Sequence, residues 1–178
     1  MNELSTLINS ILKETNYSNN LYFSKLNDGE FEKPDFVETQ IQFYYAVVFF
    51  SRPMAALAAK IPTPEQRVGV LKNVWEEHGE GTLAHAHGST FLKFLSRLDN
   101  ISHGQVLQRG LWPEVRIFNT TLIGACVLDD FLVSASLLGM VERMFSEISS
   151  WIGQGVIKRG WVKQNEAPHR NLWVAERK

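Results

Sequence analysis

The apolar residues of this sequence recur at helical spacing and nowhere alternate with polar residues, and this pattern most constrains the fold. Between residues 4 and 13, apolar side chains recur three or four positions apart, as on one face of a helix. Residues 35–50 are apolar around most of a helix circumference, which is typical of a helix at the centre of a bundle. Because no segment keeps strand-like alternation, the sequence predicts an all-α fold of six to eight helices.

Prolines and capping residues indicate where helices begin and end. Thr63, Pro64 and Gln66 together are typical of a helix start, and Pro113 marks another. Pro53 is expected to interrupt the central helix. The expected helices span residues 4–13, 35–50, 54–60, 64–78, 82–98, 113–128 and 130–151 or beyond. The expected connections are a loop over 16–33 that could include a short helical turn, a loop over 100–110, and a glycine-punctuated stretch over 153–168 that could include one helical segment.

Composition excludes several classes of protein. The chain has 178 residues, 44% of them hydrophobic, which suits one domain over residues 1–178 with a sizeable core. A formal net charge of -1 gives no electrostatic footprint for nucleic acid or an anionic membrane. No apolar run approaches the ~18 residues of a membrane-spanning helix, and the N-terminus lacks a secretory signal pattern. Cys126, the single cysteine, excludes an intramolecular disulfide framework and a multi-cysteine zinc cluster. We expect a soluble, cytoplasmic protein without a nucleic-acid or membrane partner.

Three ionisable residues fall on apolar helix faces. Glu142 has Leu138 and Phe145 as neighbours at helical spacing, and Glu77 and His87 also have mainly apolar neighbours. Burying a carboxylate is costly unless a cation, hydrogen bonds or a metal compensates. Two carboxylates and an imidazole that converge in a helical bundle are the ligand types of an iron or manganese centre. Core hydrogen bonds or arginine partners could satisfy the same residues, so the residues alone leave both interpretations open.

Glu77 and His87 can share one metal ion only if the helix between them is broken. In a continuous helix their Cα atoms would lie about 15 Å apart along the axis, which is too far for one ion. Gly79 and Gly81 lie where the break would be needed.

The residues beside this break leave alternatives open. Glu80 could supply the carboxylate, and His85 could supply the imidazole. His78 and His103 are expected to face solvent or to cap helices.

The segments around these residues resemble a known family. Residues 73–81, Asn-Val-Trp-Glu-Glu-His-Gly-Glu-Gly, precede an Ala86–His87 pair, and residues 138–143 are Leu-Gly-Met-Val-Glu-Arg. Both segments resemble motifs of the haem-oxygenase-like di-iron oxidases and oxygenases. That superfamily includes the chlamydial protein that associates with death domains, and it is related to the TenA and PqqC proteins. The resemblance covers roughly residues 36–169.

The resemblance implies a seven-helix bundle with two irons between its core helices. Glu77, His87 and Glu142 would be iron ligands, and Glu38 and His169 are further candidates. Members of the family use such iron to activate O2 and oxidise a small molecule. The resemblance therefore implies an iron-dependent oxidase or oxygenase whose partners are O2 and a small-molecule substrate.

The C-terminal segment departs from the family pattern. The last core helix of the family usually supplies a histidine, an aspartate four residues later and a histidine three residues after that. Counted from His169, these two later places are held by Trp173 and Glu176. If the first histidine is instead expected at position 173, Trp173 replaces it and all three residues are missing. The resemblance thus predicts a bundle that lacks part of its last core helix. Its iron site would be incomplete, mononuclear or completed by a neighbouring chain.

Two other functions are compatible with the same scaffold. A metal-free enzyme similar to TenA would need a cysteine nucleophile, and Cys126 is the one candidate, although its apolar neighbours favour a core position. A non-catalytic interaction protein would use an apolar groove near Trp151, Trp161 and Trp173, exposed where the last helix is missing. Such a groove leads us to expect a homodimer or a larger assembly.

Overall fold

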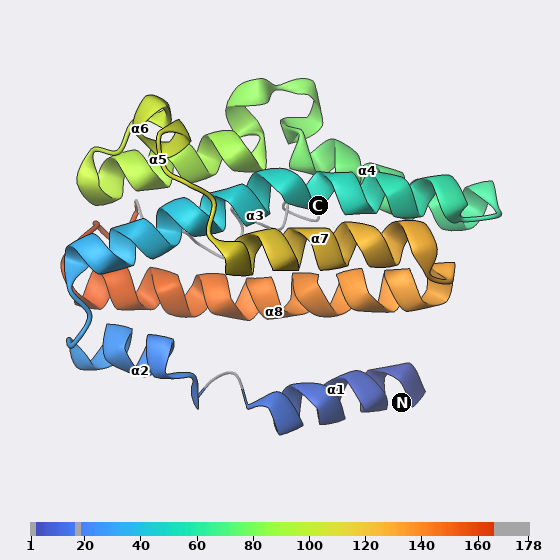
Figure 1. Cartoon of the computed structure of the whole chain (residues 1–178), viewed down its shortest axis with the longest axis horizontal. Coiled ribbons are helices and arrows are strands. Elements are labelled where there is room, and N and C mark those ends of the chain that lie inside the picture. The colour runs from blue at the N-terminus through green and yellow to red at the C-terminus, as the bar shows by residue number, and fades with distance from the viewer. Residues whose placement is uncertain (1–2, 17–18, 166–178) are drawn as a thin grey trace.

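The computed structural model describes residues 3–16 and 19–165 (Figure 1). These residues form eight α-helices and contain no strand, so the all-α prediction is confirmed. The helices are α1 (Glu3–Thr15), α2 (Leu21–Asp28), α3 (Lys33–Lys60), α4 (Pro64–Glu77), α5 (His87–Asp99), α6 (His103–Leu107), α7 (Pro113–Leu128) and α8 (Phe131–Lys158). Two 3-10 turns, η2 (Gly79–Gly81) and η3 (Leu83–His85), join α4 to α5.

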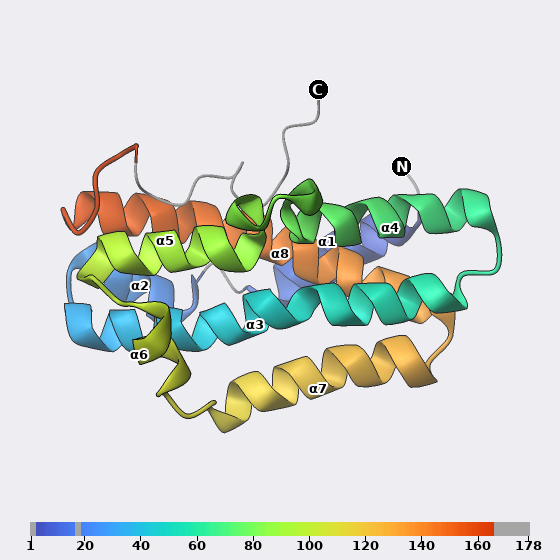
Figure 2. The same cartoon turned by 90° about the horizontal axis from the view of Figure 1, so that it is seen from above.

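Helix α3 is the centre of the bundle, as its apolar circumference predicted. It contacts α4, α5, α7 and α8, and in the view from above it runs between α4 and α5 on one side and α7 on the other (Figure 2). Buried side chains lie along its whole length, from Phe36 to Ala58. They belong to two apolar clusters, one shared with α2, α5 and the end of α8, the other shared with α7 and the first half of α8.

The predicted interruption at Pro53 is wrong, because α3 continues through it. Proline removes one backbone hydrogen bond and crowds the preceding turn, which costs ~3 kcal/mol in an isolated helix. Here Pro53 is fully buried, and its neighbours Met54 and Leu57 belong to the cluster that packs α3 against α7 and α8. Packing on both sides of the proline therefore outweighs its local cost.

Two segments expected to be connections contain helical structure, which the expectation had left open. In the first, α2 begins at the cap Asn20, whose side chain accepts a hydrogen bond from the Tyr22 backbone N–H, and ends at Gly29 in the left-handed conformation. In the second, α8 continues through two buried glycines to Lys158. The two helices touch where a Cβ on Gly155 would lie 2.6 Å from the Leu26 side chain. The glycine that suggested a connection thus permits close helix packing.

The predicted starts at Pro64 and Pro113 are confirmed, but two other boundaries are not. Helix α5 begins at His87 rather than at residue 82, because the preceding residues form the two 3-10 turns. The expected loop over 100–110 contains α6, which a capping box between Ser102 and Gln105 begins.

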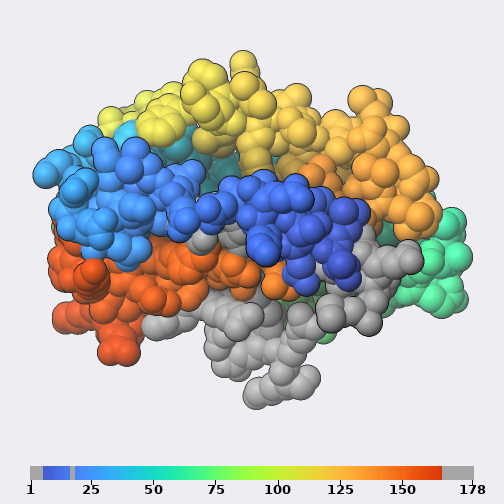
Figure 3. Space-filling model, turned by 90° about the horizontal axis from the view of Figure 1, so that it is seen from below, coloured from blue at the N-terminus to red at the C-terminus, as the bar shows by residue number. Residues whose placement is uncertain are grey.

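The N-terminal helices lie on the outside of the bundle. Figure 3 shows α1 and α2 following one another across one face, and α2 contacts α8. Among the described helices, none combines the length and apolarity needed to cross a membrane.

Candidate metal centre

Glu77 and His87 form a close pair at the junction of two helices. Glu77 ends α4 and His87 begins α5. The His87 Nδ1 and Glu77 Oε1 atoms are 2.7 Å apart, and their side chains are only 12% and 15% exposed. A neutral imidazole that donates from Nδ1 carries its lone pair on Nε2, the form in which histidine binds metals. The predicted convergence of these two residues is confirmed.

A strap over residues 78–86, which contains both 3-10 turns, brings the pair together. Three successive residues adopt left-handed backbone conformations: Gly79 at φ 68°, Glu80 at φ 53° and Gly81 at φ 86°. Glycine tolerates such angles, whereas an L-residue such as Glu80 pays ~1 kcal/mol or more for them. The break predicted from the glycines is therefore present, and it replaces the separation of about 15 Å that a continuous helix would impose.

Glu142 does not point into the core, so that prediction is wrong. Its side chain is exposed, while the neighbouring Val141 is buried. Glu142 Oε1 accepts a 3.5 Å hydrogen bond from Asn73 Nδ2 on α4. Asn73 lies four residues before Glu77, so the structure brings Glu142 to within about one helical turn of the pair. The sequence analysis missed Asn73, although its i,i+4 spacing from Glu77 was a usable signal.

Aromatic residues follow His87 and Glu142 by about one helical turn. Phe91 follows His87 by one turn of α5, and Phe145 follows Glu142 by about one turn of α8. The Phe43 ring packs against both, with centroid distances of 5.8 Å to Phe91 and 5.2 Å to Phe145. We call these three rings the aromatic layer. They fill space between α3, α5 and α8.

Glu38 lies in a different network. Its carboxylate contacts Arg109 Nε at 3.3 Å and accepts a 3.2 Å hydrogen bond from Gln42 Nε2. Buried Gln42 also bonds the Gly110 carbonyl and the Trp112 backbone N–H, fixing the connection between α6 and α7 to α3. Val48 marks the level of the donor pair on α3, because it lies against Gly88 in the first turn of α5. Glu38 precedes Val48 by ten residues, or about 15 Å along α3. The structure therefore does not bring Glu38 to the pair.

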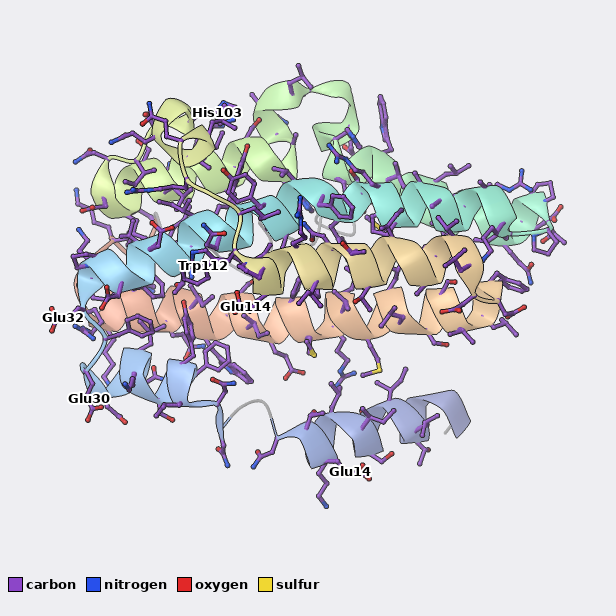
Figure 4. All side chains as sticks on the ribbon, in the orientation of Figure 1. Glu14, Glu30, Glu32, His103, Trp112 and Glu114 are labelled. Atoms are coloured by element: carbon purple, nitrogen blue, oxygen red, sulfur yellow. The ribbon has the colours of Figure 1, made fainter. Side chains whose placement is uncertain are left out.

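The alternative ligands lie on the surface. The side chains of Glu80 and His85 are exposed. His78 Nδ1 contacts the Val74 carbonyl at 2.8 Å, at the end of α4, as expected of a capping residue. His103 is exposed at the start of α6 and bonds the Tyr44 hydroxyl (Figure 4).

The remaining candidate ligand, His169, lies outside the described residues. Within the described residues, no three His, Cys, Asp or Glu side chains come together as a metal-binding group. The described site is thus a two-residue donor pair with a third carboxylate about one turn away.

Cys126 lies in the core, as its neighbours predicted. Burial raises the pKa of its thiol, nearby Asp129 raises it further, and Lys60 acts in the opposite direction. A raised pKa lowers the thiolate fraction, and the thiolate is the nucleophile. We therefore expect iodoacetamide at pH 8 to leave the native protein unlabelled and to label Cys126 in urea, as measured by intact-mass spectrometry. Stoichiometric labelling of the native protein would revive the hypothesis of a cysteine nucleophile.

Two of the three tryptophans expected near an open groove are packed instead. The rings of Trp151 and Phe23 lie 5.1 Å apart, and Trp161 packs against Phe36 and under the Arg159 guanidinium. Trp173 lies outside the described residues. Self-association stays a prediction.

The helical fold and the donor pair can be compared with known proteins. No curated protein matches the sequence. Residues 37–159 match the family model described as iron-containing redox enzyme, and this segment includes Glu77, His87 and Glu142. Because the match covers more than half of the chain, this protein belongs to the haem-oxygenase-like family of iron-containing redox enzymes.

Proposed function

We propose that this chain binds iron at the Glu77–His87 pair and serves the oxidation of a small molecule by O2. The observation that carries the proposal is the 2.7 Å contact between an imidazole and a carboxylate, both largely shielded from water, in a chain of an iron-containing redox family.

The donors suit iron in kind. Imidazole and carboxylate are the side chains that hold non-haem iron in helical bundles. A histidine that binds a metal through one nitrogen usually donates its other N–H to a carboxylate or carbonyl, as His87 does to Glu77. Two donors do not complete an iron site, so we propose Glu142 and His169 as additional ligands.

The chain itself positions the His87 imidazole and places apolar rings near the site. Bound iron would supply the one-electron chemistry with O2 that amino-acid side chains lack. Glu77 orients the His87 ring, and the strap fixes the distance between the two helices that carry them. The aromatic layer extends from below His87 towards Glu142, and apolar surroundings strengthen electrostatic interactions with a bound cation.

Metal content after anaerobic loading tests this proposal. Metal-free protein is incubated with ferrous iron, excess iron is removed, and iron per chain is measured by plasma mass spectrometry. We expect between about one and two irons per chain, and O2 uptake when the loaded protein meets aerated buffer. Zinc-loaded protein is the matched control, because zinc has no redox chemistry. A folded, helical protein that retains no iron would contradict the proposal.

A further inference from the structure

The first turn of α5 lies unusually close to α3. A Cβ placed on Gly88 would be 2.7 Å from Val48 Cγ1, a separation that real Cβ atoms essentially never show. The same Cβ would lie 3.9 Å from the Tyr44 ring. Gly88 has ordinary helical geometry, so its backbone angles do not require glycine. The close approach of Val48 therefore points to packing as the role of this glycine.

A second close approach lies at the start of the strap. A Cβ on Gly79 would lie 2.4 Å from the Ala86 backbone nitrogen and 2.7 Å from the His85 carbonyl carbon. The strap therefore folds back on itself directly before His87. The two close contacts bracket the donor pair, because Gly79 follows Glu77 by two residues and Gly88 follows His87 by one.

We infer that Gly88 is a positioning residue that brings His87 within hydrogen-bond reach of Glu77 by letting α5 dock on Val48. Relieving the overlap to an ordinary contact of 3.4 Å would move the start of α5 by about 0.7 Å. A 2.7 Å hydrogen bond lengthened by that amount leaves the range in which N–H···O bonds are strong. The value of this positioning for iron rests on the proposed function, whereas the positioning itself does not.

Val48 cannot easily give way. A valine in a helix strongly prefers one χ1 rotamer, so its Cγ1 has no ready alternative position. Because rotating Val48 away from this rotamer has a cost, we expect the start of α5 to move if Gly88 gains a side chain. Removing Cγ1 should restore the space, which makes the inference testable by rescue.

The test compares Gly88→Ala, Val48→Ala and the double variant. Gly69→Ala is the matched control, because it lies in α4 and a Cβ there meets nothing within 4 Å. In metal-free protein with ¹⁵N-labelled histidine, NMR identifies the ring tautomer of His87. We expect Gly88→Ala to lose the Nδ1–H signal of the Glu77 bond. Val48→Ala, the double variant and the Gly69→Ala control should keep it. Ferrous iron affinity should fall about 10- to 100-fold in Gly88→Ala, as when a residue that orients a metal ligand is lost, and should recover in the double variant.

The outcomes separate this inference from the proposed function. If Gly88→Ala keeps the signal, or if the double variant folds but fails to regain it, the inference is overturned. If Gly88→Ala does not fold, the double variant decides: a folded protein with the wild-type signal supports the inference, and an unfolded one overturns it. A wild-type protein that binds no iron would contradict the proposed function and leave the NMR result to decide the positioning.

Discussion

Replacing His87 with alanine lowers the affinity for ferrous iron by about 100-fold or more, because the site loses its imidazole donor. Even residues that only orient a metal ligand change metal affinity by ~10- to 100-fold, so removal of a donor should exceed that range. The variant should remain folded, because His87 is the first residue of α5 and its side chain is not among the fully buried core. Iron binding is measured by competition with a chromophoric chelator under nitrogen, and folding is measured by circular dichroism.

Two surface residues of the strap provide matched controls. His85→Ala removes an exposed imidazole two residues away, and Glu80→Ala removes an exposed carboxylate from the same strap. Both should retain wild-type iron affinity, whereas Glu77→Ala should not. If His85→Ala or Glu80→Ala loses iron while His87→Ala keeps it, the alternative ligands are the true ones and the Glu77–His87 contact is only structural.

The donor pair could be predicted because its signals are local. Thr63 with Pro64 defines the start of α4, and the two glycines define its end, so the position of Glu77 follows from short-range chemistry. His87 required one further argument, that a broken helix could return the chain to the same place. The structure shows that return as backbone contact between Gly79 and Ala86.

Glu142 shows where helical spacing stops being informative. Its neighbours Leu138 and Phe145 do face the core, so the apolar face of α8 was identified correctly. Glu142 follows Leu138 by four residues and is therefore rotated from it by about 40° around the helix, towards the edge of that face. Val141, on the other side of Leu138, takes the buried position. A long charged side chain at such an edge can reach solvent or a neighbouring helix, and Glu142 reaches Asn73.

The sequence left α2 and the end of α8 open for a different reason, because the signals of these helices depend on the segment that packs against them. Gly155 indicates a connection when considered alone, and Leu26 alone does not define a helix. Together they form the contact between α8 and α2, which neither segment reveals separately. Pro53 also misleads when considered alone, because it predicts an interruption of the helix. Tertiary packing compensates for this local helix breaker, and α3 continues through it.

Phe36→Ala should lower the free energy of unfolding by about 3–5 kcal/mol, the usual cost of removing a buried phenylalanine ring. Phe36 has no exposed surface, and its ring packs against Phe31, Trp161 and Tyr22, which belong to segments far apart in the sequence. The cavity would therefore loosen the contacts of α2 and of the segment after α8 at once. Urea unfolding followed by circular dichroism measures the effect.

Leu128→Ala is the control, because Leu128 is 83% exposed and its truncation should change stability by less than ~0.5 kcal/mol. Phe36 lies twelve residues before Val48 on α3, about 18 Å from the level of the donor pair. Iron per chain in the folded Phe36→Ala protein should therefore equal that of the wild type. A variant that keeps its stability would show that the cluster around Phe36 is not formed in solution. A stable fold with lost iron would show that the site depends on a part of the bundle distant from Glu77 and His87.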